Sequence, residues 1–562
     1  MDRRDFIKSR PKKQPVPVLS DTEFTQPFRT ESGISSYTGS WTEQEVTHLL
    51  KRTMFGAKRA DIVYFKNKTM SQAVDELLNP TAQAPAPPVK EYITTANPGT
   101  TPDGNILQGT TWVNDINNDG TVQSQRRGSY KKWWTGVMIN QDRSIREKLI
   151  MFWVDHFGNE SGDVGNTNWI YKQHELIRQY VFGNFKQLVK LISTDVAMLR
   201  YLNGYLNVAS APDENYGREL LELFTLGKGP DSKYTETDVK EAAKVLTGWQ
   251  INGSTYTTFF NSNRHTAAGV DKTFSPFFNN TVITGRTGST AGNLELSDLI
   301  NMIFAQQEVS RFIVRKFYRW FVYYSIDSAT ETNVIIPLAE IFRSNNYEIK
   351  PVLAALFKSE HFFDMLNRGC LIKSPSDQVI GSIREMNTTF PALTDWDTNY
   401  GLWNTFYTWM SNMGQNLHDP PNVSGMPAYY QEPLFHEIWI NSDSLPKRNQ
   451  FTDTMINTGY SRNGQRVQFN CVAFAQTLAN PGNPNDLIEE ALSIFFRNNL
   501  SAQTKSQIKT QILLSGQQWD YYWTNAWTAW EASPTTANFN TINTRLKSLF
   551  QYFFNLSEYQ LS

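Results

Sequence analysis

Two carboxylates on a strongly apolar helix are the feature of this sequence that most suggests chemistry. In residues 220–226 apolar side chains cover nearly every direction around a helix, which predicts a helix buried on all sides. Glu219 and Glu222, three residues apart, share one side of it. A buried carboxylate is costly unless it is paired, hydrogen-bonded or bound to a metal. Glu219 and Glu222 are therefore candidate catalytic residues that need partners.

A second apolar segment carries a candidate histidine. Residues 149–154 are six consecutive apolar residues, and Asp155 and His156 follow them directly. Carboxylates in an E-x-x-E spacing together with one histidine suit several metal ions. His156 is therefore a third candidate catalytic residue, and convergence of the two helices on one cavity is the condition for a shared site.

Arginines supply the expected countercharge. Arg311, Arg315 and Arg319 form an i, i+4, i+8 stripe on an aromatic helix, and Arg218 precedes Glu219. Arg218, Arg311 and Arg315 are candidate binding residues for this reason. Two interpretations stay open: a structural network of buried Arg–Glu pairs, or a functional acid/base or metal site.

A proline-rich turn holds two further polar side chains. His418 and Asn422 flank Asp419-Pro420-Pro421, and the prolines restrict the backbone that presents them. We take His418 as a candidate catalytic residue and Asn422 as a candidate binding residue. A packed turn with a hydrogen-bonded histidine explains the same residues.

A short segment resembles the first half of a calcium loop. Oxygen-bearing side chains alternate and a glycine follows at Gly120. The candidate metal ligands are Asp115, Asn117, Asp119 and Thr121. Arg126 occupies the position at which a calcium loop has a bidentate carboxylate, so a simple Asn/Asp-Gly turn is the competing interpretation. Calcium is the one cofactor that the sequence suggests.

Composition excludes several classes of function. The 53 Lys and Arg residues balance 54 Asp and Glu residues, so no global field attracts nucleic acid or an anionic membrane. No apolar run approaches the ~20 residues of a membrane span, and two cysteines exclude a disulfide scaffold. Nucleotide-binding, serine-hydrolase and zinc-binding motifs are missing from the sequence. The 16 tryptophans indicate an aromatic core or an aromatic surface groove.

The hydrophobic periodicity predicts a mainly α protein. Residues 1–40 lack it and suggest a flexible N-terminal arm, whereas 41–562 is expected to be one large helical domain. Thr42 and Glu45 form a capping-box pattern that starts its first helix. Long loop or short β-hairpin insertions are expected at about 92–128 and 250–295, and strands only there.

Several motifs together resemble the bacterial domain of unknown function 1800 family. They occur in chain order over about residue 41 to the end. The motifs are HLLKRTMFG at 48–56, REK at 146–148 with FW at 152–153, PDENYGRELLELFTLG at 212–227, YTETDV at 234–239, VLTGW at 245–249 and HDPPNVSG at 418–425. The resemblance implies a helical fold in a protein that is often exported and often encoded beside a sulfatase-like partner. It implies no established activity.

The chain departs from the family pattern at three positions. Val154 stands where relatives commonly have the first histidine of an H-x-H pair, Met426 replaces a tryptophan, and Thr266 follows His265 in place of an aspartate. These departures weaken a catalytic model that depends on the missing histidine.

Localisation is not fixed by the N-terminus. Residues 3–8 resemble a twin-arginine export motif, but no apolar segment of ~7–15 residues follows them. Envelope or secreted localisation is what the family resemblance implies.

Two functions remain open at this point. The first is a cell-envelope or secreted interaction protein, associated with glycan and working with a sulfatase-like partner. The alternative is a metal-dependent or acid/base enzyme with a buried site around Glu219, Glu222, His156 and His418. An open pocket reaching those side chains favours the enzyme, whereas complete pairing without a cavity favours the interaction protein.

Overall fold

The protein is mainly α-helical, as the periodicity predicts. The computed structural model describes residues 33–93, 103, 106–266 and 269–562. The N-terminal helices are α2 (Glu43–Thr53), α3 (Arg59–Lys66) and α4 (Met70–Leu78). The predicted capping box at the start of α2 is present, with Thr42 accepting from the N–H of Gln44 and Glu45 accepting from the N–H of Thr42. Most of the predicted flexible arm at residues 1–40, including the arginine motif at 3–8, lies outside the described residues, which begin at residue 33.

A central group of helices follows. It consists of α5 (Gly120–Ile139), α6 (Arg146–His156), α7 (Ser161–Val164), α8 (Thr167–Tyr180), α9 (Phe185–Ile192), α10 (Val196–Tyr201), η1 (Gly204–Leu206), α11 (Asn215–Glu219), η2 (Leu220–Thr225) and α12 (Glu236–Val245). The insertion expected at about 92–128 ends earlier than predicted, because α5 begins at Gly120. In its described part the only β contact is an isolated bridge between Val89 and Thr111.

The second expected insertion does contain strands. Two antiparallel pairs, with short 3₁₀ turns, form one edge of the molecule. They are β1 (Trp249–Asn252) with β2 (Thr257–Phe260), η3 (Ser262–Arg264), and β3 (Lys272–Thr273) with β4 (Val282–Ile283), which flank η4 (Pro276–Phe278). A third hairpin of β5 (Tyr460–Arg462) and β6 (Gln465–Val467) lies outside both predicted stretches, so the expectation that strands occur only there was wrong.

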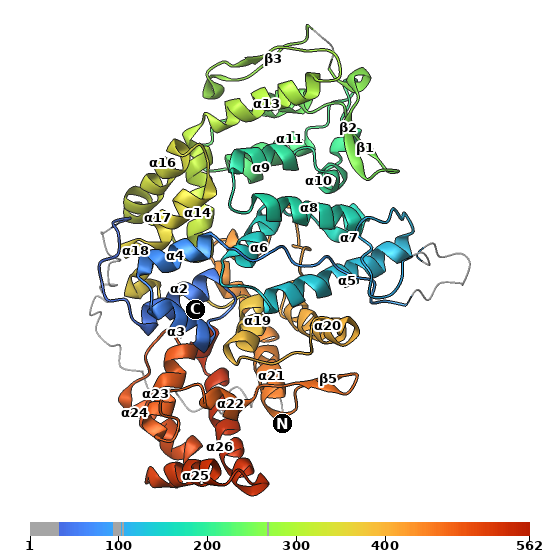
Figure 1. Ribbon diagram of the computed structural model, residues 1–562. Coiled ribbons are helices and arrows are strands. Elements are labelled where there is room, and N and C mark those ends of the chain that lie inside the picture. The colour runs from blue at the N-terminus through green and yellow to red at the C-terminus, as the bar shows by residue number, and fades with distance from the viewer. Residues whose placement is uncertain (1–32, 94–102, 104–105, 267–268) are drawn as a thin grey trace, which may run out of the picture.

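The remaining helices follow β4 along the chain. They are α13 (Ala291–Phe304), α14 (Gln307–Phe321), α15 (Ser328–Thr330), η5 (Glu331–Ile335), α16 (Ile336–Ser344), α17 (Ile349–Phe357), α18 (Glu360–Phe363), η6 (Met365–Asn367), α19 (Pro375–Glu385), α20 (Trp396–Asn412), η7 (Pro427–Tyr429), η8 (Phe435–Trp439), α21 (Ser444–Asn457), α22 (Cys471–Ala475), α23 (Pro484–Phe495), α24 (Ala502–Gln507), η9 (Ile508–Leu513), α25 (Tyr521–Ala532), α26 (Thr536–Asn555) and η10 (Ser557–Gln560). Figure 1 shows β1–β3 and α13 at one end, α25 and α26 at the other, and α2–α4 between them.

One continuous hydrophobic cluster runs through these elements, from Val46 in α2 to Tyr559 near the C-terminal end. No helix in the described ranges is both long and apolar enough to cross a bilayer. Both cysteines are free thiols, with Cys471 buried and Cys370 half-buried.

Candidate functional site

Glu219 and Glu222 are not buried, which corrects the expectation from the sequence. Both are half-buried, and Glu222 pairs with the exposed Lys228. The helix changes from α to π geometry at Leu220, so the N–H of Leu226 donates to the carbonyl of Leu221, five residues earlier. The wider turn alters the direction of each side chain relative to the 3.6-residue period used to predict burial.

The expected arginine partners lie elsewhere. Arg218 pairs with Glu214 and Glu236 at the surface. Arg315 binds Glu308 and Glu331, and Arg311 has only a 3.4 Å hydrogen bond to the side-chain oxygen of Gln307. None of the three forms an ion pair with Glu219 or Glu222 in the described structure, so the expected buried Arg–Glu network around this helix is not formed.

His156 is fully enclosed and uses both ring nitrogens. The Lys316 ammonium donates to Nδ1 over 2.9 Å, and Nε2 lies 3.2 Å from the carbonyl oxygen of Phe224. Burial, together with the Lys316 charge, holds the pKa of His156 well below its ordinary value. Neutral His156 therefore donates from Nε2 and accepts at Nδ1, and neither nitrogen is open to a substrate.

Asp155 and His418 converge, whereas His156 and His418 share no hydrogen-bond partner among the described residues. The N–H of Met426 donates to Asp155 over 2.7 Å, which fixes the loop that follows the proline turn against the end of α6. Both Asp155 and His418 line a cavity of about 20 Å³. Because one water needs roughly 10–15 Å³ of such a cavity, this one has room for about one water and not for a substrate.

His418 belongs to a buried chain of hydrogen bonds. Its Nδ1 lies 2.9 Å from the hydroxyl of Tyr130, and that hydroxyl lies 2.9 Å from Nδ1 of His174. Nε2 of His418 is 3.0 Å from the side-chain oxygen of Asn159, and Arg178 reaches Nε2 of His174 at 3.1 Å. Burial lowers the pKa of His418 to about 4 and holds that of His174 well below its ordinary value, so both rings are neutral.

The neutral rings give the chain a single direction. Arg178 donates to His174, His174 to Tyr130, Tyr130 to His418, and His418 to Asn159. Asn159 donates to Gln173 over 2.6 Å, and Gln173 donates to Asp195 over 2.9 Å.

The two ends of the chain are carboxylates. Glu147 forms an ion pair with Arg178, with the shorter contact at 2.6 Å. Asp195, whose burial raises its pKa to about 6, also caps α10 through the N–H of Met198. Each link has a donor and an acceptor, so the network orders the core at α5, α6 and α8.

Asn422 is exposed and lies outside this chain. Its amide nitrogen donates to the Tyr430 hydroxyl over 2.8 Å, and its oxygen accepts from the N–H of Ser424. The proline turn therefore separates its two polar residues, with His418 inside and Asn422 at the surface.

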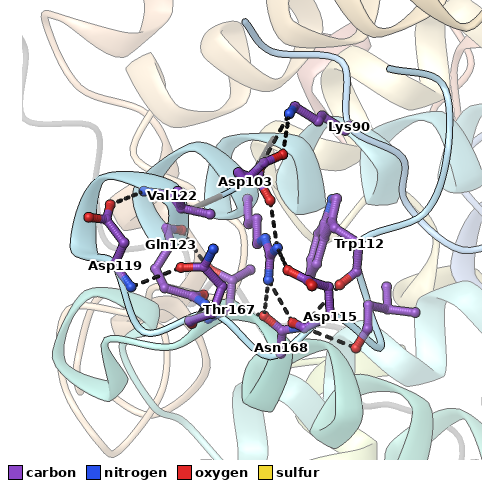
Figure 2. Close-up of polar contacts among 12 residues, drawn as sticks. Lys90, Asp103, Trp112, Asp115, Asp119, Val122, Gln123, Thr167 and Asn168 are labelled. Carbon is purple, nitrogen blue, oxygen red and sulfur yellow. Dashed lines mark hydrogen bonds and ion pairs between the residues drawn. The ribbon is translucent and has the colours of Figure 1, made fainter. Parts of the chain in front are cut away.

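The candidate calcium loop holds the guanidinium group of Arg126 in place of a metal ion. Asp103, Asp115 and Asn168, which are labelled in Figure 2, all contact the fully buried Arg126. The distances to Arg126 are 2.8 Å from Asp103 and 2.9 Å from Asn168, and Asp115 forms an ion pair with it. The residue that disfavours calcium in the sequence thus fills the place that calcium would need.

The other candidate ligands serve the start of α5. Asp119 accepts from the N–H groups of Thr121 and Val122, as the N-cap of the helix, and Asn117 accepts from the N–H of Asp119. In the described residues no group of three or more His, Cys, Asp or Glu is arranged to hold a metal ion. The calcium interpretation is not supported by this geometry.

The structure reveals an aromatic groove that sequence reasoning did not locate. It has a volume of about 330 Å³ and lies between α5, α20 and the segment 82–89. We call it the aromatic groove. Its aromatic lining consists of Trp133, Trp396, Tyr400 and Trp403. The high tryptophan content was the one signal for it, but only the packing of α20 on α5 brings these rings together.

Polar groups line the same groove. Both side-chain polar atoms of Gln141 are buried without a hydrogen-bond partner in the described structure, and so is the indole nitrogen of Trp403. Asp142 and Arg146 also line it. A buried donor or acceptor without a protein partner is satisfied when a water or a ligand supplies the missing hydrogen bond, so these atoms are available to the polar groups of a ligand.

Comparisons with known proteins yield one match. The model of the family described as "Protein of unknown function (DUF1800)" matches residues 48–561, nearly the whole chain. No curated protein and no solved structure matches it.

Proposed function

Because the chain belongs to the DUF1800 family, whose description gives no function, we propose a function from its geometry: it is a glycan-binding interaction protein that holds a sugar chain in the aromatic groove. The observation that carries this proposal is the combination of four aromatic side chains with the unpartnered Gln141 amide in one groove. Sugar rings offer apolar C–H faces and polar hydroxyl edges, and the groove offers a surface for each.

The size of the groove agrees with this ligand class. A volume of about 330 Å³ falls in the usual range of small-molecule pockets, about 300–1,000 Å³. Trp396 is half-buried, so one part of its ring faces solvent. Trp133 is held in place by a 2.6 Å hydrogen bond from its indole nitrogen to the Ala86 carbonyl. Aromatic rings fixed in this way lose little conformational entropy when a ligand stacks on them.

The test is titration of the protein with a panel of soluble neutral and sulfated oligosaccharides, followed by tryptophan fluorescence and calorimetry. We expect Gln141→Ala to weaken binding about tenfold, the effect of one hydrogen bond of about 1.4 kcal/mol. Its melting temperature should be unchanged or higher, because the amide has no protein partner to lose. Trp396→Ala should weaken binding by removing a stacking surface.

The matched control is Trp519→Ala, which removes a tryptophan that is 66% exposed and does not line the groove. It should leave the affinity unchanged. The proposal fails if no oligosaccharide in the panel binds, or if Trp396→Ala and Gln141→Ala bind as tightly as the wild type.

The setting that we propose for this binding is the cell envelope or the exterior, together with a sulfatase-like protein encoded nearby. The family resemblance supports it. Cell fractionation with an antibody to the protein tests the location, and co-purification of that partner, identified by mass spectrometry, tests the association. Recovery in the cytoplasm alone, without the partner, would contradict this part of the proposal.

An acid/base enzyme is the second candidate. Burial raises the pKa of Asp155 to about 7, so that its carboxyl can exchange a proton near neutrality. The adjoining cavity disfavours catalysis, because about 20 Å³ is too small for a substrate. Hydrolysis of a panel oligosaccharide that is lost in Asp155→Asn would favour the enzyme over the binding protein.

A further inference from the structure

A third cavity lies beside α6, which contributes Lys148 to its lining. It has a volume of about 40 Å³. Residues of α2, α6, α14, η7, η8, the segment 371–377 and Ser562 line it, so parts of the chain that are far apart in the sequence meet there. We call it the cationic cavity, because of the residues described next.

Four basic side chains line the cationic cavity. They are Lys51 and Arg52 of α2, Lys148 of α6 and Arg319 of α14. The first three are nearly inaccessible to solvent, with 4–6% of each residue exposed. One carboxylate of the lining, Asp377, pairs with Lys148, and Glu385 behind the lining pairs with Lys51 at 2.6 Å.

Two of the four cations have no carboxylate within ion-pair distance in the described parts of the chain. Arg52 donates to the carbonyl of Asn367 and to the Cys370 sulfur. Arg319 donates to the Tyr324 carbonyl, and Glu432 acts on it only from a distance. The side chains around the cavity therefore carry more positive charge than the side-chain carboxylates Asp377 and Glu385 balance.

Two further basic side chains, Arg448 and Lys373, lie directly behind the lining. Arg448 is fully buried and donates to the carbonyls of Lys373 and Trp439, without an ion pair in the described structure. Lys373 is 4% exposed, and its ammonium lies 3.5 Å from the centre of the Tyr559 ring. Burial, with the charge of Lys51, holds the pKa of Lys373 well below its ordinary value.

His436 adds a neutral donor to the lining. Its Nδ1 accepts a 3.1 Å hydrogen bond from the N–H of Ile372. Burial lowers its pKa to about 4, so the ring is neutral and its single proton is on Nε2. That nitrogen is buried and has no acceptor among the described residues.

Unbalanced buried charge is costly, because each desolvated ion without a partner loses several kcal/mol of hydration. An anion in the cavity would remove this cost for Arg52 and Arg319 and would also accept from His436. The volume suits it, since about 40 Å³ is roughly the space of three waters. Phosphate and sulfate groups are compact, and arginine and lysine are their usual protein partners.

We propose that the cationic cavity binds a phosphate or sulfate group, either as the free ion or as part of a larger molecule. Arg52 and Arg319 supply charge, and His436 donates a hydrogen bond from Nε2. This site is separate from the aromatic groove, so the proposal is independent of glycan binding there.

The test is thermal unfolding of the full chain in potassium phosphate, potassium sulfate or potassium chloride at one fixed ionic strength. Phosphate or sulfate should raise the melting temperature with a saturable dependence on concentration, as expected for a ligand of the folded state. Chloride should not. A parallel titration with glycerol 1-phosphate distinguishes a site for the free ion from a site for a phosphate group on a larger molecule.

Two variants locate the effect. Arg52→Met should weaken the apparent affinity by at least about tenfold, the loss of a hydrogen bond from a charged donor. His436→Asn keeps an acceptor for the Ile372 N–H but removes the Nε2 donor, and it should also weaken binding. The control is Arg311→Met, which removes an arginine of α14 that does not line the cavity.

If Arg52→Met does not fold, His436→Asn still tests the site, because His436 is only half-buried. The proposal is overturned if chloride stabilises the protein as much as phosphate and sulfate do. It is also overturned if both cavity variants retain the wild-type affinity, or if Arg311→Met weakens binding as much as they do.

Discussion

At the scale of single residues, several buried ionisable groups have hydrogen bonds that compensate most of the cost of burial. Both terminal nitrogens of Arg126 donate to buried acceptors. His418 accepts from the Tyr130 hydroxyl at Nδ1 and donates from Nε2 to the side-chain oxygen of Asn159. The sequence singled out His418 for chemistry, but its surroundings explain it as part of the core.

Arg126 provides the first test at this scale. Arg126→Met should lower the free energy of unfolding by about 3–5 kcal/mol, because it leaves the fully buried Asp103 without its guanidinium partner. Arg127→Met changes the next residue of α5, which is only half-buried and forms no ion pair in the described chain, and should cost far less. Urea unfolding measures both, and equal losses would contradict the role given to Arg126.

The pH dependence of stability tests His418. Its folded-state pKa of about 4 lies below the ordinary value of 6.5, so the unfolded chain takes up a proton first as the pH falls. Stability from this residue is therefore full above pH 6.5 and is lost between pH 6.5 and 4, by up to about 3 kcal/mol.

The measurement is the difference in unfolding free energy between the wild type and His418→Gln. Asp155 and Asp195, whose raised pKa values act in the opposite direction, are present in both proteins and largely cancel. The wild-type advantage should shrink as the pH falls from 6.5 to 4. A difference that stays constant over this range would show that His418 is not held neutral.

At the scale of elements, α5 links the features described above. It carries Arg126, which binds Asp103 and Asp115 in the segment before the helix. It also carries Tyr130 of the buried hydrogen-bond chain and Trp133 of the aromatic groove. Gly136 on the same helix allows α20 to approach, since a Cβ there would lie 2.5 Å from the Trp403 ring.

The packing of α5 on α20 gives a matched pair of variants. Gly136→Ala should destabilise by about 1–3 kcal/mol, because the added methyl group displaces the buried Trp403 ring. Gly128→Ala lies on the same helix with no atom within 4 Å of the new Cβ, and should stabilise by up to about 1 kcal/mol. Denaturant unfolding compares them, and equal effects would contradict the close approach of the two helices.

At the scale of the whole molecule, the N-terminal helices are held by residues far along the chain. His48 lies 2.9 Å from the carbonyl of Phe362, and Lys51 donates to the Phe495 carbonyl over 3.0 Å. In Figure 1 α2 and α3 lie between the two ends of the molecule, and α2 contacts α23.

This arrangement leads to a prediction about cooperativity. Because one hydrophobic cluster spans α2 to the C-terminal residues, we expect residues 41–562 to unfold as one domain in a single transition. Thermal unfolding followed by far-ultraviolet circular dichroism and by tryptophan fluorescence should then give the same midpoint. Two separated midpoints would show that the chain is divided into independent domains.

The sequence by itself determined the helical class, the family and local signals such as the Thr42 capping box and the strand pairs within 249–283. These depend on periodicity and on contacts between near neighbours. It misplaced Glu219 and Glu222, because a π turn is set by how the helix packs and leaves no clear sequence pattern.

Only the tertiary structure decided which polar residues meet. The aromatic groove joins Trp133 to rings about 270 residues later in the chain, and the cationic cavity joins α2 to α14 and η8. Arg126 lies near the candidate calcium ligands in the sequence, yet its partner Asp103 is identified only in three dimensions. Charge balance and unpartnered atoms are properties of such long-range neighbourhoods, and no local pattern in one sequence specifies them.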